Sequence, residues 1–98
     1  MTIIKMIDGD RLTLQLEGRL DTGTAPQLEK ELGDNLSGVN TLVLDLKDLV
    51  YISSAGLRVV LAAQKRMKKQ GKMTVKNVCG DIMEVFEITG FVDILTIL

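Results

Sequence analysis

Two kinds of hydrophobic periodicity alternate along this chain, and their order restricts the fold more than any other feature. Arg11 to Glu17 repeats every two residues, with leucines on one side and polar side chains on the other, as in a half-buried strand. From Ala25 onwards, segments with a helical repeat alternate with short apolar stretches. Strands that alternate with helices form right-handed crossovers and a mostly parallel sheet. The chain is therefore predicted to have an α/β fold.

The expected order of elements is β-β-α-β-α-β-α-β, which contains three crossover helices. A turn signal at residues 8–10 predicts that the first two strands form an antiparallel hairpin at one edge of the sheet. Leu42–Leu44 is apolar on both faces, as in a central strand that is covered on both sides. Strands are predicted at residues 2–7, 11–17, 41–46 with a continuation at 50–52, 72–76 and 91–98. Helices are predicted at residues 25–36, from the serine pair 53–54 to about 70, and 81–89.

Local signals mark the ends of these helices. Two pairs of residues have the spacing of a capping box at the first and third helices: Thr24 with Gln27, and Asp81 with Glu84. Each helix is followed by a glycine that is expected to end it: Gly38, Gly71 and Gly90. The basic run Lys65–Lys69 closes the second helix, where the helix dipole favours cations, and is interpreted as a solvated helix end.

Composition excludes several classes of function. The 98 residues are the length of one domain, and residues 1–98 are treated as one. The chain has no histidine and one cysteine, which argues against Ser-His and Cys-His catalysis, a metal site and an internal disulfide. A net charge of -1 argues against direct binding to nucleic acid. No apolar run approaches the ~20 residues of a membrane helix, so we expect no membrane insertion, a cytoplasmic location and no cofactor.

Two loops form the candidate functional site. Gly18–Gly23 follows the second strand, and Tyr51–Leu57 follows the central strand. Sites in open α/β sheets gather at the carboxyl ends of parallel strands, so Asp21, Thr22 and Ser54 are expected to share one surface.

The serine pair in the second loop has two interpretations. Ser53 and Ser54 either cap the following helix, or one of them accepts a phosphoryl group. A phosphoryl group at a helix N-terminus would meet free N–H groups and a favourable dipole. Gly56 would let another backbone approach closely.

Four segments also carry a family resemblance: Gly18–Asp21 (GRLD), Thr24–Pro26, Leu42–Leu46 and, most specifically, Tyr51–Leu57 (YISSAGL). Together with the order of elements over nearly the whole chain, they resemble the STAS domains, named for sulfate transporters and anti-sigma factor antagonists. The resemblance implies the STAS fold, a mixed and mostly parallel sheet with an antiparallel edge hairpin. In that family the serine two positions before this glycine is phosphorylated, which implies that Ser54 is the acceptor. Ser53 is the second candidate.

The small stand-alone antagonists of that family imply a function without catalysis. Unphosphorylated, the protein would bind an ATP-binding anti-sigma factor serine kinase and release a sigma factor; phosphorylated at Ser54, it would dissociate. A PP2C-type phosphatase would reverse the modification. The residues expected to contact the partner are Asp21, Thr22, Gly23, Ser53, Ser54, Ala55 and Gly56. The alternative is a STAS scaffold subunit of a lipid-transport or other multiprotein complex without phosphorylation. An enzyme with Ser54 as nucleophile is disfavoured, because no histidine or nearby lysine could act as its base.

Overall fold

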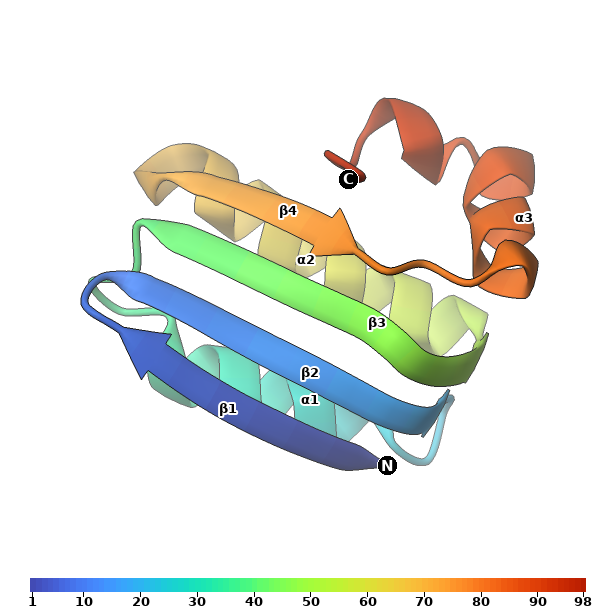
Figure 1. Cartoon of the computed structure of the whole chain (residues 1–98), viewed down its shortest axis with the longest axis horizontal. Coiled ribbons are helices and arrows are strands. Elements are labelled where there is room, and N and C mark those ends of the chain that lie inside the picture. Colours follow the sequence, from blue (N-terminus) through green and yellow to red (C-terminus); the bar gives the residue numbers. More distant parts are fainter.

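The computed structural model describes all 98 residues and contains one four-stranded mixed sheet (Figure 1). The strands are β1 (Thr2–Asp8), β2 (Arg11–Leu20), β3 (Thr41–Ile52) and β4 (Lys72–Lys76), and they lie in this order across the sheet. β1 pairs with β2 antiparallel, whereas β2 with β3 and β3 with β4 are parallel. The predicted edge hairpin and the mostly parallel sheet are therefore confirmed.

Three helices connect and flank these strands. α1 (Ala25–Asn35) and α2 (Ser54–Gln70) lie side by side on one face of the sheet, behind it in Figure 1. α3 (Gly80–Thr89) lies off the carboxyl end of β4. No helix covers the opposite face of the sheet (Figure 1), yet Leu42, Val43 and Leu44 are all buried, so this part of β3 is covered on both sides as predicted. None of the three helices is long and apolar enough to cross a membrane.

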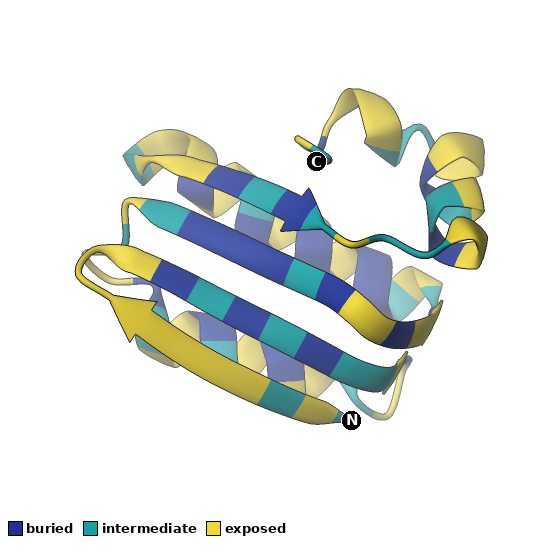
Figure 2. Ribbon diagram, viewed as in Figure 1, coloured by how far each residue is buried: buried dark blue, intermediate teal, exposed yellow.

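The core lies between the sheet and the helices α1 and α2. The three alternating leucines of β2 are fully buried, as their two-residue repeat predicts. Figure 2 shows this alternation along β2. α1 contributes Leu28 and Leu32, and α2 contributes Val60 and Met67. Apolar burial of this kind is the main stabilising contribution to the fold, at about 25 cal/mol for each Å² removed from water.

β2 is longer than its sequence pattern predicts, and β3 is continuous where its sequence pattern predicts a break. β3 continues from Thr41 to Ile52 without a break, although Lys47 and Asp48 interrupt its apolar pattern. The register between the two strands shifts twice near their carboxyl ends, and Gly18 lies at the second shift with a φ of 101°. Such irregularities in a ladder insert an unpaired residue and change the direction of a strand. Beyond these shifts, both strands continue to the two candidate loops.

The predicted last strand, residues 91–98, is wrong. Phe91–Asp93 is a short 3-10 helix (η1), and the only strand-like pairing that follows is a single bridge between Val75 and Ile97. Phe91 stacks on Phe86, with ring centroids 6.2 Å apart, and Leu95 is buried. Phe91 and Leu95 are four positions apart, which is the spacing of a helical turn and not of a strand. Gly90, with a φ of 79°, ends α3 as predicted and turns the chain into η1.

The capping box predicted for the third helix is also absent. Cys79 occupies the N-cap position in an extended conformation, and no side chain caps the helix. Asp81 lies inside the first turn instead, where a negative charge still interacts favourably with the helix dipole. The thiol of Cys79 lies 3.7 Å from the carbonyl oxygen of Leu49, which holds the residue before the helix against β3.

Candidate functional site

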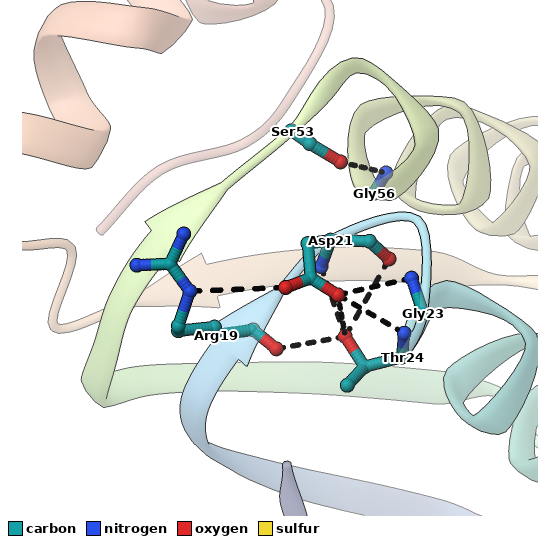
Figure 3. Close-up of polar contacts among 6 residues, drawn as sticks. All are labelled: Arg19, Asp21, Gly23, Thr24, Ser53 and Gly56. Carbon is teal, nitrogen blue, oxygen red and sulfur yellow. Dashed lines mark hydrogen bonds and ion pairs between the residues drawn. The ribbon is translucent and has the colours of Figure 1, made fainter.

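The two candidate loops are in direct contact at the carboxyl ends of β2 and β3. The backbone N–H of Ser53 donates to the carbonyl oxygen of Leu20 at 2.9 Å. Gly56 is buried against the same residue, because a Cβ added there would lie 2.7 Å from Leu20 Cγ and 3.0 Å from its carbonyl oxygen. The close backbone approach expected at Gly56 is therefore present. The glycine is buried beneath the two loops and lets them pack together. Figure 3 shows the two loops facing one another.

The loop after β2 is a turn organised by the carboxylate of Asp21. Its Oδ1 accepts from the backbone N–H groups of Gly23, at 3.0 Å, and Thr24, at 3.2 Å. The Oγ1 of Thr24 donates to the carbonyl oxygen of Arg19 at 2.7 Å and accepts from the N–H of Asp21 at 2.9 Å (Figure 3). An aspartate that accepts backbone N–H groups two and three residues later forms an Asx-type turn.

This turn replaces the capping box predicted at Thr24. Thr24 is the N-cap of α1, but its hydroxyl makes no capping hydrogen bond because it is used within the turn. The side chain of Gln27 donates to the carbonyl oxygen of Met1 instead, at 3.1 Å. The local turn thus engages Thr24, and a tertiary contact engages Gln27.

Hydrogen bonds and a nearby cation keep Asp21 ionised. Partial burial by itself raises the pKa of this carboxyl group. The hydrogen bonds from Thr24 and Gly23, together with the charge of Arg19, outweigh that effect and lower the pKa below its usual value of 3.8. The Nε of Arg19 lies 3.7 Å from Asp21 Oδ2. At neutral pH this loop therefore presents a fixed negative charge.

The two serines after β3 have different surroundings. Ser53 is the N-cap of α2: its backbone is extended, and its Oγ accepts from the N–H of Gly56 at 3.4 Å (Figure 3). Ser54 is the first residue of α2 and is exposed. Capping is therefore carried by Ser53, and the hydroxyl of Ser54 is accessible at the positive end of a 17-residue helix.

The remaining residues predicted for the site divide between surface and support. Thr22 and Gly23 are exposed, Ala55 is half-buried, and Gly56 is buried. A groove of about 230 Å³ between α1 and α2 begins at this point, and seven residues line it: Thr22, Ala25, Pro26, Glu29, Ala55, Arg58 and Val59. Thr22 and Ala55 thus border one concave surface.

Three residues of this region are not predicted as site residues by the sequence analysis. The guanidinium of Arg19 lies over the ring of Tyr51, 4.1 Å from its centroid, and joins the ends of β2 and β3. Arg58 follows Ser54 by four residues, one helical turn further along α2. That spacing is visible in the sequence and could have indicated Arg58, whereas the pair of Arg19 and Tyr51 depends on the register of two strands.

Other polar residues considered in the sequence take part in ordinary structural contacts. Asp45 Oδ1 accepts from the backbone N–H of Lys47 and from the side chain of Asn77, and Asp48 accepts from the side chain of Gln15. No three side chains of the kinds that commonly bind metals come together anywhere in the protein.

The fold and site define a class: a small mixed α/β domain that presents an accessible serine at a helix N-terminus beside an acidic turn. Comparison with known proteins makes the assignment specific. The sequence profile of the STAS domain matches residues 2–98, and the chain belongs to the STAS domain family.

Two relatives carry regulatory names. The chain is 43% identical over 93 residues to BtrV of Bordetella bronchiseptica, whose name assigns it provisionally to the anti-sigma factor antagonists; the match covers 93% of this chain and 79% of BtrV. It is 32% identical over 95 residues to the anti-sigma-B factor antagonist of Bacillus subtilis, covering 96% and 86% of the two chains.

Solved structures share the fold. The anti-sigma factor antagonist SpoIIAA in its unphosphorylated form superposes with a TM-score of 0.78 at 17% identity, over 99% of this chain and 87% of that one. The phosphorylated form of the Bacillus cell fate determinant SpoIIAA gives a TM-score of 0.77 at 18% identity, over 99% and 91%.

Proposed function

We propose that this protein is an anti-sigma factor antagonist that works in the cytoplasm and is switched by phosphorylation of Ser54. The names of the relatives that match nearly all of this chain support the role. The choice of Ser54 as the acceptor rests on the different surroundings of two neighbouring serines. Ser53 caps α2, and Ser54 is exposed beside it. Unphosphorylated protein would bind an anti-sigma factor serine kinase, and the kinase would then release its sigma factor.

The switch is a phosphoryl transfer to Ser54 within that complex. The Oγ of Ser54 attacks the γ-phosphorus of ATP bound to the kinase, the bond to the β-phosphate oxygen breaks, and ADP leaves. A base of the kinase takes the hydroxyl proton, since this chain offers no histidine. A PP2C-type phosphatase would hydrolyse the phosphoserine and restore the binding form.

The helix N-terminus makes this modification compatible with the fold. The phosphate at Ser54 would lie among N–H groups and in the favourable field of α2, with Arg58 one turn away. Its charge of nearly -2 would add to the ionised carboxylate of Asp21 on the facing loop. We therefore expect the domain to stay folded while its binding surface becomes strongly negative, which opposes a partner that carries nucleotide phosphates.

The binding surface extends from Ser54 to the turn after β2, over Asp21, Thr22, Gly23 and Ala55. Asp21 is engaged in its own turn, so Thr22, whose side chain is exposed and borders the groove, is the cleaner probe of contact. Thr22→Lys is expected to weaken binding of the kinase at least tenfold, about 1.4 kcal/mol, with unchanged thermal stability.

A matched control for Thr22→Lys is Ser37→Lys. Ser37 is also small, polar and exposed, but it lies between α1 and β3, at the other end of the parallel strands. The affinity of each variant for the kinase, measured by calorimetry, shows whether Thr22 lies on the contact surface. Equal loss in both variants would indicate a general charge effect, and no loss at Thr22 would place the contact surface elsewhere.

Phosphate mapping tests the acceptor. The protein is incubated with its cognate anti-sigma factor kinase and ATP, and the modified residue is located by mass spectrometry in the wild type, Ser53→Ala and Ser54→Ala. We expect modification of the wild type and Ser53→Ala, and none of Ser54→Ala. Phosphate on Ser53 would move the acceptor by one residue. No incorporation on either serine by an active kinase would favour a scaffold without phosphorylation.

A further inference from the structure

We infer that the free edge of β1 is a self-association surface, through which two copies of this chain pair antiparallel and join their sheets into one. β1 is the first strand in the sheet order, so it pairs only with β2, and its outer backbone groups have no strand partner. It stays in unbroken register with β2 from Thr2 to Asp8. A regular, exposed edge of this length is a template for pairing with another strand.

The usual features that protect an edge strand are weak in β1. The strand has seven residues, without proline or a bulge, and a single charged side chain, Lys5, lies between its ends. Three of its apolar side chains are exposed: Ile4 by 40%, Met6 by 49% and Ile7 by 67%. Figure 2 shows most of β1 in the colour of exposed residues, whereas the neighbouring β2 alternates between buried and half-buried residues.

These side chains occupy both faces of the sheet. Ile3 and Ile7 pair with Leu16 and Leu12 of β2, whose side chains face the helices. Ile4 and Met6 therefore point to the opposite face, which no helix covers. A partner strand at this edge would bury apolar surface above and below the sheet.

The partner that fits this edge is a second copy, because the strand complements itself. A two-fold axis through Lys5 places Ile3 opposite Ile7 of the second copy and Ile4 opposite Met6 of the second copy, so that apolar side chains meet on both faces. The overall net charge of -1 adds little repulsion between copies. An isologous contact of this kind closes at two chains.

Lys5 is the one unfavourable position in this register, because it lies opposite itself at the axis. Its ammonium group is turned towards α1, where Nζ lies 3.2 Å from Asn35 Oδ1, so the two charges need not meet. An interface confined to one strand is smaller than the ~800 Å² per partner of stable complexes. We therefore expect a weak, reversible dimer.

Sedimentation velocity from about 10 µM to about 1 mM, the range of weak affinities, tests the dimer without any partner protein. The wild type is expected to shift reversibly from monomer to dimer. Ile7→Lys should weaken the dimer at least tenfold. Ile88→Lys is the matched control, because Ile88 is 79% exposed but lies on α3, and it should dimerise as the wild type does. A wild type that stays monomeric, a dimer that survives Ile7→Lys, or growth into larger aggregates would overturn the proposal.

Mixing experiments test the register. Lys5→Glu alone should dimerise no more tightly than the wild type, because glutamate then faces glutamate. An equimolar mixture of wild type and Lys5→Glu should associate several-fold more tightly than either alone, since the axis then joins opposite charges. A mixture that associates no better than the average of its components would overturn the two-fold axis at Lys5. Met6→Lys, from the other face of the strand, should weaken the dimer as Ile7→Lys does.

Discussion

At Ser53 the hydroxyl accepts the N–H of Gly56, whereas one residue later the side chain of Ser54 is exposed in the first turn of α2. The two serines should therefore differ in what they contribute to stability. Ser53→Ala removes the cap and is expected to lower the free energy of unfolding by about 1 kcal/mol. Ser54→Ala should change it by less than about 0.5 kcal/mol. Urea denaturation of both variants measures the difference, and an equal loss in both would contradict the assignment of the cap to Ser53.

Gly56 is the residue at which the two loops of the site touch most closely. An added Cβ would lie 2.7 Å from Leu20 Cγ, so Gly56→Ala is expected to lower the free energy of unfolding by about 1–3 kcal/mol. Gly33→Ala is the matched control: Gly33 lies in α1, and a Cβ there would meet nothing within 4 Å. It should raise the free energy of unfolding by about 0.5–1 kcal/mol, because alanine is the better helix former.

Chemical denaturation of the two glycine variants measures both effects. Opposite signs are expected from the same substitution in two different environments. A stabilising Gly56→Ala would mean that β2 and α2 are further apart than this contact requires.

At the scale of elements, the turn between β2 and α1 depends on the charge of one side chain. Hydrogen bonds and Arg19 lower the pKa of Asp21 in the folded protein, so the ionised carboxylate stabilises the fold above the ordinary pKa of 3.8. That contribution is lost as the pH falls through the lowered pKa. Asn can accept the same backbone hydrogen bonds but carries no charge.

Asp21→Asn is therefore expected to be less stable than the wild type at pH 7, and this difference should become smaller at an acidic pH, because the charge of Asp21 is lost as the pH falls through its lowered pKa. The midpoints of urea unfolding at the two pH values give the result. A deficit of the same size at both pH values would show that the effect arises from packing and not from the charge.

A comparison of the predicted and observed helices and strands shows which sequence signals predict the structure correctly. The alternating leucines of β2 and the helical repeats of α1 and α2 predict their elements correctly, because burial of one face is decided locally. The apolar sequence of residues 91–98 predicts a strand, yet the segment forms η1 and a single bridge. The structure of this segment includes the stacking of Phe91 on Phe86. These residues are five positions apart, and neither the strand repeat nor the helix repeat predicts that contact.

The candidate site was predictable to a similar degree. Parallel strands place their carboxyl ends at one edge, and this general rule brings the loops of Asp21 and Ser54 together. The capping box at Thr24 failed, because Asp21 and Arg19 compete for the same hydroxyl. The stacking of Arg19 on Tyr51 depends on register shifts near the end of β3, which the sequence does not reveal.

At the scale of the whole molecule, the fold separates the candidate switch from the core. Ser54 lies on the surface at the positive end of α2, and the packed side chains that hold α2 on the sheet begin further along the helix. A phosphate there would change the charge of the surface without entering the apolar interior. Modification is thus expected to act on binding and to leave the fold intact.

The affinity of the anti-sigma factor kinase for this protein before and after stoichiometric phosphorylation at Ser54 tests that account most directly. Calorimetry should show that phosphorylation weakens binding at least tenfold, or about 1.4 kcal/mol, with circular dichroism spectra and melting temperature nearly unchanged. Ser54→Ala should keep the affinity of the unmodified wild type. Equal affinity of the phosphorylated and unphosphorylated forms, or a loss of binding that accompanies unfolding, would contradict it.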